Sequence, residues 1–192
     1  MIEQRREELE EYGVVLEYLP TGKSFSANPE PIVQLIGEER FTLLEVLLKP
    51  GTQVKLEERL YIGKGERDKV SLIKTRLAYS ELTEGARNEL YNAIAGIIKR
   101  NEPRFVGVFN KAGPLNIREH SLELLPGIGK KHLQAILNAR DQKEFESFAD
   151  LSTRVPLLQD PVKLLTERVL TELKEESRFY LLTRPYSRHH PF

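Results

Sequence analysis

The chain has 192 residues, a length that suits one large domain or two small ones. Its 29 basic and 29 acidic residues give a formal net charge of zero, so any contact with nucleic acid must use a local patch. The absence of cysteine excludes disulfides, cysteine nucleophiles and thiolate metal or iron–sulfur sites, and it fits a reducing cytoplasm. No run of apolar residues is long enough for a membrane span or a signal peptide. We therefore predict a cytoplasmic protein without a cofactor or a membrane segment.

The first half of the chain has the pattern of a small β-barrel. Residues 1–11 are mostly Glu and Arg and predict a charged arm. Short β-like runs with turn signals between them then predict five or six strands, followed by one amphipathic helix capped by Ser80 or Thr83. The strands are expected at 12–19, 32–36, 41–48, 54–62 and 69–79, the helix at about 81–100, and a further short strand or extended linker at 104–110. A linker at Gly113-Pro114 then predicts that this β domain covers 12–113.

The strand count and the run Leu60-Tyr61-Ile62-Gly63-Lys64-Gly65 resemble an OB-fold barrel. Such barrels bind nucleic acid on one strand face, where cations follow phosphates and aromatic rings stack on bases. Between residues 64 and 76 five cations stand against two acids. The alternative is an ordinary solvated strand face with its tyrosines half in the core. The candidate binding residues on this face are Tyr61, Lys64, Lys69, Lys74 and Arg76.

The second half is organised around Leu125-Pro126-Gly127-Ile128-Gly129-Lys130-Lys131. Pro126 ends a short apolar helix, and the two glycines allow a tight turn. Leu133, Ile136 and Leu137 then mark the buried face of a second helix. Unpaired amides and the positive end of the helix dipole lie at the start of that helix, beside two lysines. This combination favours an anion, and above all a phosphate.

This stretch resembles the helix-hairpin-helix motif of nucleic-acid-binding proteins that do not read sequence. The resemblance extends from Leu115-Asn116-Ile117 to a second unit, in which Ser147 starts a short helix and a final helix covers about 162–176. The second hairpin has Leu157-Leu158-Gln159-Asp160 in place of the glycines, and its acid would repel phosphate. We therefore expect a paired-hairpin domain over 114–180, with a structural second half, and a flexible tail over 181–192.

The whole chain also resembles an archaeal family of unknown function that is described as predicted OB-fold nucleic-acid-binding proteins. That resemblance implies nucleic-acid binding near translation or RNA processing, and no demonstrated chemistry. We predict a non-enzymatic, largely sequence-independent binder of RNA or DNA phosphates, with RNA favoured and no small-molecule substrate. In such hairpins a monovalent cation is often held by loop carbonyls, here those of Leu125 and Gly127, and we expect no other metal. The hairpin contacts are expected from Gly127, Ile128, Gly129, Lys130, Lys131, Arg118 and Arg140.

Two other functions stay open. Paired hairpins also serve as protein-docking modules, which the zero net charge permits. In helix-hairpin-helix DNA glycosylases a lysine at the position of Lys131 attacks the sugar as a Schiff-base nucleophile. Those enzymes also need a downstream aspartate in a Val-Asp-Thr-His-like context, which this chain lacks.

Overall fold

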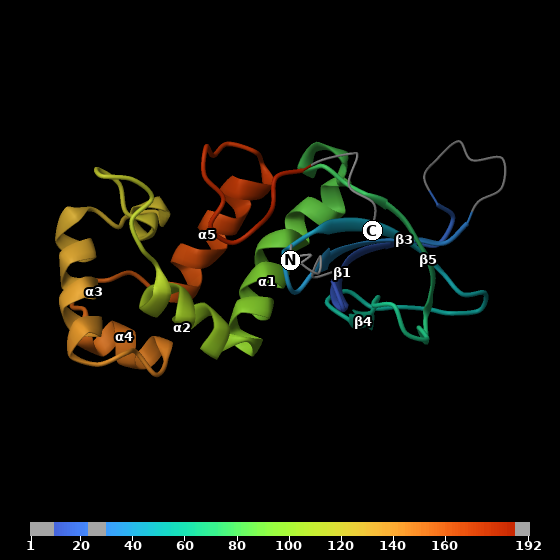
Figure 1. Ribbon diagram of the computed structural model, residues 1–192. Helices are drawn as coiled ribbons and strands as arrows, with labels where there is room; N and C mark the ends of the chain where they lie inside the picture. Colours follow the sequence, from blue (N-terminus) through green and yellow to red (C-terminus); the bar gives the residue numbers. More distant parts are fainter. Residues whose placement is uncertain (1–9, 23–29, 187–192) are drawn as a thin grey trace, which may run out of the picture. The chain divides into compact units, whose positions relative to one another are not determined.

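The computed structural model describes residues 10–22 and 30–186, and it shows a mixed α+β protein (Figure 1). The chain forms two compact units. One runs to Ala93 and includes the chain again from Thr183, and the other is Ile94–Leu182. The division falls inside helix α1, Glu84–Arg100, and not near residue 113, where the sequence predicts it. Most of the predicted charged arm, residues 1–9, lies outside the described residues.

The first unit contains a curled antiparallel sheet whose described strands lie in the order β4-β1-β2-β3-β5. The predicted turn between the second and third strands is confirmed, since the Gly37 amide donates to the Thr42 carbonyl and the two strands pair. β4 and β5 are the outer strands, paired with β1 and β3 respectively. The strands are β1 Tyr12–Leu19, β2 Ile32–Gly37, β3 Leu43–Leu48, β4 Arg59–Tyr61 and β5 Val70–Arg76.

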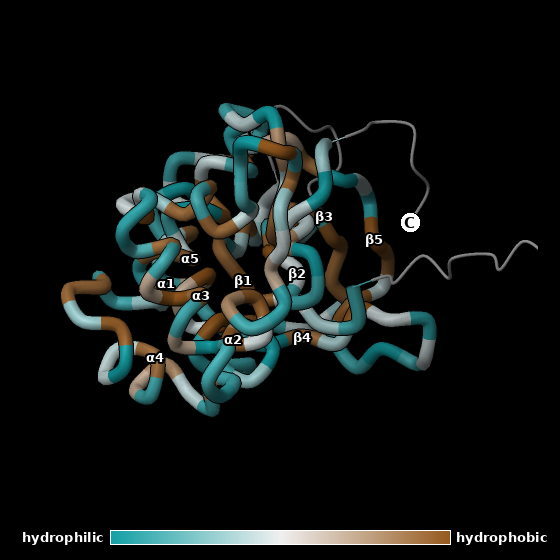
Figure 2. The backbone as a smooth tube through the Cα atoms, turned by 60° about the vertical axis from the view of Figure 1, so that its left-hand side comes forward, coloured by the Kyte–Doolittle hydropathy of each residue, from teal (hydrophilic) through white to brown (hydrophobic). Residues whose placement is uncertain are grey.

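The central strands are buried on both faces, which explains their nearly continuous apolar sequence. Val33 lies opposite Val46 in the core cluster of one face. On the other face Gln34 lies opposite Glu45, and both are buried. Val14, Val15 and Leu16 of β1 are buried as well, and the tube in Figure 2 is hydrophobic over part of this strand. The sheet predicted from the strand pattern is therefore confirmed as a curled five-strand sheet.

Helix α1 begins three residues later than predicted, because Tyr79–Glu81 forms a separate 3-10 turn, η1. Thr83 caps the helix, since its Oγ1 accepts the Ala86 amide at 3.2 Å. Of the two capping residues that the sequence allowed, the structure therefore selects Thr83.

The second unit is helical, and it corrects one predicted element. Residues 104–110 form helix and not strand, because Pro103 occupies the first turn of α2, where a missing amide costs nothing. Phe105, Val106 and Phe109 then share one buried helical face. The helices predicted after residue 129, after Ser147 and at the end of the domain are confirmed, although the last ends at Leu173. The elements are α2 Glu102–Lys111, η2 Ser121–Leu124, α3 Lys130–Gln142, α4 Phe148–Arg154 and α5 Pro161–Leu173.

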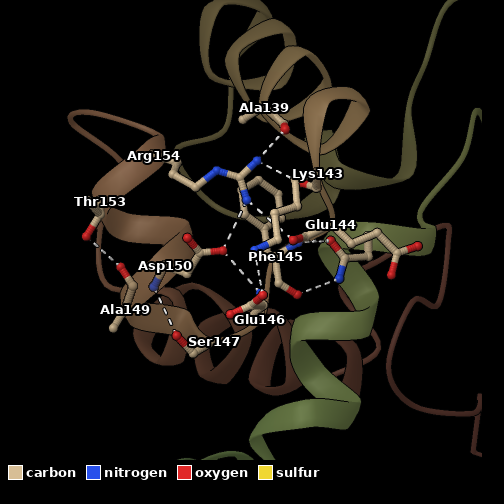
Figure 3. A network of polar contacts seen from close by, with 11 residues as sticks. Ala139, Lys143, Glu144, Phe145, Glu146, Ser147, Ala149, Asp150, Thr153 and Arg154 are labelled. Atoms are coloured by element: carbon tan, nitrogen blue, oxygen red, sulfur yellow. Dashed lines mark hydrogen bonds and ion pairs between the residues drawn. The ribbon is translucent and has the colours of Figure 1, made fainter.

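Arg154 joins the two hairpins by holding the end of α3 against α4 (Figure 3). Its guanidinium donates to the carbonyl of Lys143, the residue after α3, and to the carbonyl of Ala139, which also accepts the Lys143 amide. It also pairs with Asp150 at 3.1 Å. The predicted Ser147 cap of α4 is confirmed, since its Oγ accepts the Asp150 amide at 3.0 Å.

A buried ion pair between Arg168 and Glu172 anchors the end of the helical unit. The Nε of Arg168 lies 2.7 Å from Oε1 of Glu172, and both side chains are buried. The guanidinium of Arg168 also donates to the last residue of η2, and the carboxylate of Glu172 accepts amides from the segment after α5. The further contacts are from Arg168 to the Leu124 carbonyl, to the Ser177 hydroxyl and to the Phe179 carbonyl, and from the amides of Leu181 and Leu182 to Glu172.

The described part of the predicted tail, residues 181–186, is held by hydrogen bonds. Beyond the amides bound by Glu172, the guanidinium of Arg76 donates to the carbonyls of Arg184 and Pro185, both at 3.3 Å. These six residues therefore belong to the folded units. Residues 187–192 of the predicted tail lie outside the described residues.

Candidate functional site

The first hairpin, residues 125–131, forms the tight turn that its glycines predict. Gly127 has a φ of +78°, a conformation that costs a glycine little. The Ile128 amide donates to the Leu125 carbonyl at 3.2 Å, and both of these side chains are buried. The turn is therefore anchored by its apolar residues and presents its backbone outward.

Helix α3 begins without a side-chain cap among the residues that the structure describes. Its N-cap is Gly129, which has no side chain to accept the first amides, and the first turn contains no acid. Three or four backbone N–H groups at the positive end of the helix dipole therefore have no side-chain cap among the described residues, although the Glu123 carboxylate binds the side chain of Lys130 at this helix end. This is the arrangement in which helix N-termini bind phosphate.

The two lysines after the glycines are in different states. Nζ of Lys130 lies 2.7 Å from Oε1 of Glu123 and donates to the Arg118 carbonyl at 3.2 Å. The hydrogen bond from Lys130 holds the pKa of Glu123 below its usual range, so this acid stays ionised and compensates the lysine. Lys131 is exposed and has no hydrogen bond or ion pair with any residue that the structure describes. Lys131 is therefore the available cation at the turn.

The two predicted arginines also differ. Arg118 is exposed on the loop before η2, and its guanidinium has no partner within the described ranges. Arg140 instead donates through Nη1 to the carbonyls of Phe109 and Ala112, at 3.1 and 2.7 Å. It satisfies the end of α2, so the structure removes Arg140 from the predicted phosphate contacts. The resemblance to the hairpin motif gave no sign of this, because residues 104–110 were expected to be a short strand or an extended linker.

The histidines near the hairpin make contacts of their own. Nδ1 of His120 accepts the Leu122 amide at 3.2 Å and caps η2. Burial, and next the charge of Arg140, lower the pKa of His120, so the ring is neutral at neutral pH and adds no charge for a phosphate. Nδ1 of His132 lies 3.2 Å from the Gly127 carbonyl, one of the two expected to hold a monovalent cation. The ring and a cation would therefore compete for that oxygen.

The second hairpin has the same turn built from different residues. Leu157 has a φ of +66°, close to that of Gly127, and the Leu158 amide donates to the Val155 carbonyl at 3.3 Å. Unlike α3, helix α5 has a side-chain cap. The carboxylate of Asp160 accepts the Val162 amide at 2.9 Å. The protein's own anion therefore occupies the place that is open in the first hairpin.

The cations of the sheet are mostly engaged by partners distant in sequence. Lys69 binds Glu58, and Lys74 lies 3.5 Å from buried Glu45. Neither acid falls within residues 64–76, so the local excess of positive charge read from the sequence is largely cancelled in space.

The other predicted residues of the β face follow the same trend. The hydroxyl of Tyr61 accepts the Gly65 amide at 3.1 Å, and its ring packs edge-on against Tyr12. Arg76 is bound to the carbonyls of residues 184 and 185. Only Lys64, of the five candidates on this face, is exposed and without a partner among the residues described. The ring of Tyr61 is thus packed within the fold and does not form an open stacking surface.

Two further features are absent from residues 10–22 and 30–186. No group of three or more His, Asp or Glu side chains there is arranged to hold a metal ion. No helix in these ranges combines the length and the hydropathy that crossing a bilayer requires.

Sequence reasoning missed two exposed aliphatic residues near the first hairpin. Ile117 is fully exposed on the loop before η2, and Leu157 is 91% exposed at the tip of the second hairpin. The available signal was the alignment of the two hairpins, which places Leu157 where the first has glycine.

The fold and the site together define a mixed α+β protein with a curled antiparallel sheet and a helical unit that contains two matching turns. The chain belongs to the family described as "Protein of unknown function (DUF655)", whose model matches residues 9–184. It is 39% identical to the uncharacterized protein MJ0038 of Methanocaldococcus jannaschii over 180 residues, which are 93% of this chain and 82% of that protein. The crystal structure of Af1531 from Archaeoglobus fulgidus superposes with a TM-score of 0.84 at 43% identity, and covers 91% of this chain and 100% of that one. The resemblance to an archaeal family of unknown function is therefore confirmed.

Proposed function

We propose that this protein binds the phosphate backbone of nucleic acid through the first hairpin, without catalysis and largely without reading sequence. One contrast supports this proposal above all. The N-terminus of α3 is open beside exposed Lys131, whereas Asp160 fills the N-terminus of α5.

The chemistry of the open end fits a phosphate. Backbone amides there would donate to phosphate oxygens, and Lys131 and Arg118 would add charge. Lys130 would contribute less, because Glu123 already compensates it. With two to three phosphates neutralised, the logarithm of the binding constant should fall against the logarithm of salt concentration with a slope of about −1.5 to −2.7.

We propose in addition that the paired turns form a helix-hairpin-helix domain and that the curled sheet is OB-like. The matching turns and the five-strand sheet support these assignments. The sheet would then make a minor second contact through Lys64, because its other candidate cations are engaged. RNA is favoured over DNA on the family resemblance alone.

Two other functions, DNA glycosylase activity and protein docking, have less support. Lys131 has no acidic or basic partner in the described part of the chain, so nothing there would activate it as a Schiff-base nucleophile. A protein-docking function would be recognised by binding with little dependence on salt, because apolar contacts are not screened.

The test is fluorescence anisotropy with labelled single-stranded RNA, duplex RNA and duplex DNA at several salt concentrations. Lys131→Glu should weaken binding about tenfold or more at low salt and make the salt slope shallower. The matched control is Lys163→Glu, which changes the same charge in the first turn of α5. Because Asp160 already occupies that helix end, this control should bind nearly as well as the wild type.

The outcomes separate the possible functions. Salt-sensitive binding that is lost in Lys131→Glu but kept in Lys163→Glu would establish the first hairpin as the phosphate site. Equal losses of affinity in both variants would mean that the nucleic acid is attracted by the overall surface charge and not by the first hairpin. No binding to any of the three probes at low salt would overturn the proposal and leave protein docking as the better account.

A further inference from the structure

The tip of the second hairpin is unfavourable to folding in two ways. Leu157 has a φ of +66°, which is strained for a residue with a β-carbon, and its side chain is 91% exposed. The turn does not need the Leu157 side chain, because Val155 is buried and the Leu158 amide closes the turn by donating to the Val155 carbonyl. Glycine or asparagine would suit the conformation better. A strained, exposed leucine is therefore unexplained by the fold.

This leucine lies close to the proposed phosphate site. A β-carbon on Gly127 would come within 3.3 Å of Nε2 of Gln159, so the two turns lie side by side. The fully exposed Ile117 lies on the loop whose Arg118 carbonyl accepts Lys130 at 3.2 Å. Two exposed aliphatic side chains thus belong to segments that contact the two ends of the first hairpin.

We propose that Leu157, assisted by Ile117, contacts the bases of the nucleic acid whose phosphates the first hairpin holds, an inference that rests on the proposed function. Residues 155–160 contain no cation, and their one acid caps α5, so this turn is unsuited to a phosphate. An aliphatic side chain next to a bound backbone meets the bases or sugars of that strand. Leucine and isoleucine are the residue types that proteins insert against base steps.

Charge favours a nucleic acid over a protein partner at this surface. Ile117 directly precedes Arg118, and the turn of Leu157 lies beside Gly127, which is four residues before Lys131. Both cations are exposed and without partners among the residues the structure describes. A ligand that satisfies both features carries anionic groups next to apolar faces, as a polynucleotide does. The bases can come from a single strand or from an opened step of a duplex, and the two sources are separated by the choice of probe.

The experiment is a double-mutant cycle between the protein and its ligand. Wild type and Leu157→Asn are titrated with a short single-stranded RNA and with the same RNA in a duplex. Each probe is also made with abasic central nucleotides. Asparagine tolerates the left-handed conformation, so the variant should fold with an equal or higher Tm. Leu56→Asn, at an exposed aliphatic residue of the sheet unit, is the matched control.

Leu157→Asn should bind the intact probe about tenfold more weakly than wild type, since burying a leucine side chain contributes on that order. Its salt slope should be unchanged, because no phosphate contact is lost. Abasic substitution should weaken binding of the wild type by a similar factor and weaken the variant no further. Ile117→Asn should show the same pattern with a smaller loss. The probe on which the coupling appears identifies whether the bases are single-stranded or in a duplex.

Unchanged affinity of Leu157→Asn, or a loss that is the same on intact and abasic probes, would overturn this inference and leave the phosphate site standing. Such a result, with Leu157 instead required for capture of a protein, would assign the tip to docking. Failure of the wild type to bind any probe at low salt would overturn this inference and the proposed function together.

Discussion

The two hairpins of the helical unit share a backbone and differ in what they offer to a ligand. Gly127 and Leu157 have φ angles of +78° and +66°, and the same hydrogen bond closes both turns. The first turn leads into a helix without a side-chain cap, and the second into a helix capped by Asp160. The same backbone conformation thus occurs once with an open helix end and once with a carboxylate that occupies it.

Arg168 links the two turns, because it lies on α5, which follows the second turn, and donates to the Leu124 carbonyl, which precedes the first. Replacing Arg168 by Met leaves Glu172 buried without its counter-charge and the Leu124 carbonyl without a donor. We expect the free energy of unfolding to fall by about 3–5 kcal/mol. Urea unfolding measures this loss. The control is Lys163→Met, which removes an exposed ion pair and should cost about 0.5 kcal/mol or less. A loss for Arg168→Met as small as that of the control would show that the buried pair does not hold the turns.

The different residues at the two left-handed positions can be exchanged. Gly127→Ala should cost about 1–2 kcal/mol, since its β-carbon is strained at this φ and approaches Gln159. Leu157→Gly should gain about 0.5 kcal/mol, because relief of strain slightly exceeds the added entropy of the unfolded chain. Thermal unfolding of the two variants should shift Tm in opposite directions. Shifts of the same sign would mean that the turns are not equivalent.

The sequence predicted different shares of the structure in the two units. The first turn, its φ and the helix after it follow from two glycines and one proline, because these residues constrain the backbone locally. The prediction of a strand or linker at 104–110 was wrong. The apolar residues there, Phe105, Val106 and Phe109, are of types that favour strands, and only their packing in the helical unit shows that they share one helical face. The charge of the sheet was misjudged because Glu58 and Glu45 reach Lys69 and Lys74 only in three dimensions.

The acid of the second hairpin gives a smaller effect on binding. Asp160→Asn keeps an oxygen to cap α5 but removes the negative charge close to the first turn. Affinity for nucleic acid should rise about two- to threefold at low salt and be unchanged at high salt, where the repulsion is screened. Anisotropy measures both, and Asp141→Asn, at the far end of α3, provides a control of equal charge. A gain that survives high salt would contradict the electrostatic explanation.

The smallest effect concerns the helices that lead into the two turns. His120 caps η2 and Ser147 caps α4, so only the first cap titrates. Burial, and then Arg140, hold the pKa of His120 below its usual 6.5, so the unfolded chain binds the proton first as the pH falls. The contribution of this group to stability is therefore full above about pH 6.5 and declines below it. Proton NMR should find a midpoint below 6.5 for His120, and His120→Asn should remove that part of the pH dependence. A midpoint at or above 6.5 would contradict the burial of the ring.

The contacts of Arg168 and Glu172 have a consequence for how the protein emerges from the ribosome. The carbonyl of Leu124 immediately precedes the first hairpin, yet its partner is 44 residues later, and the carboxylate that orders this partner binds amides at 181 and 182. Because the exit tunnel conceals the most recent residues, the first hairpin is synthesised long before its frame can close. We expect the first hairpin to be held in its final position only after residues 168–182 have left the tunnel.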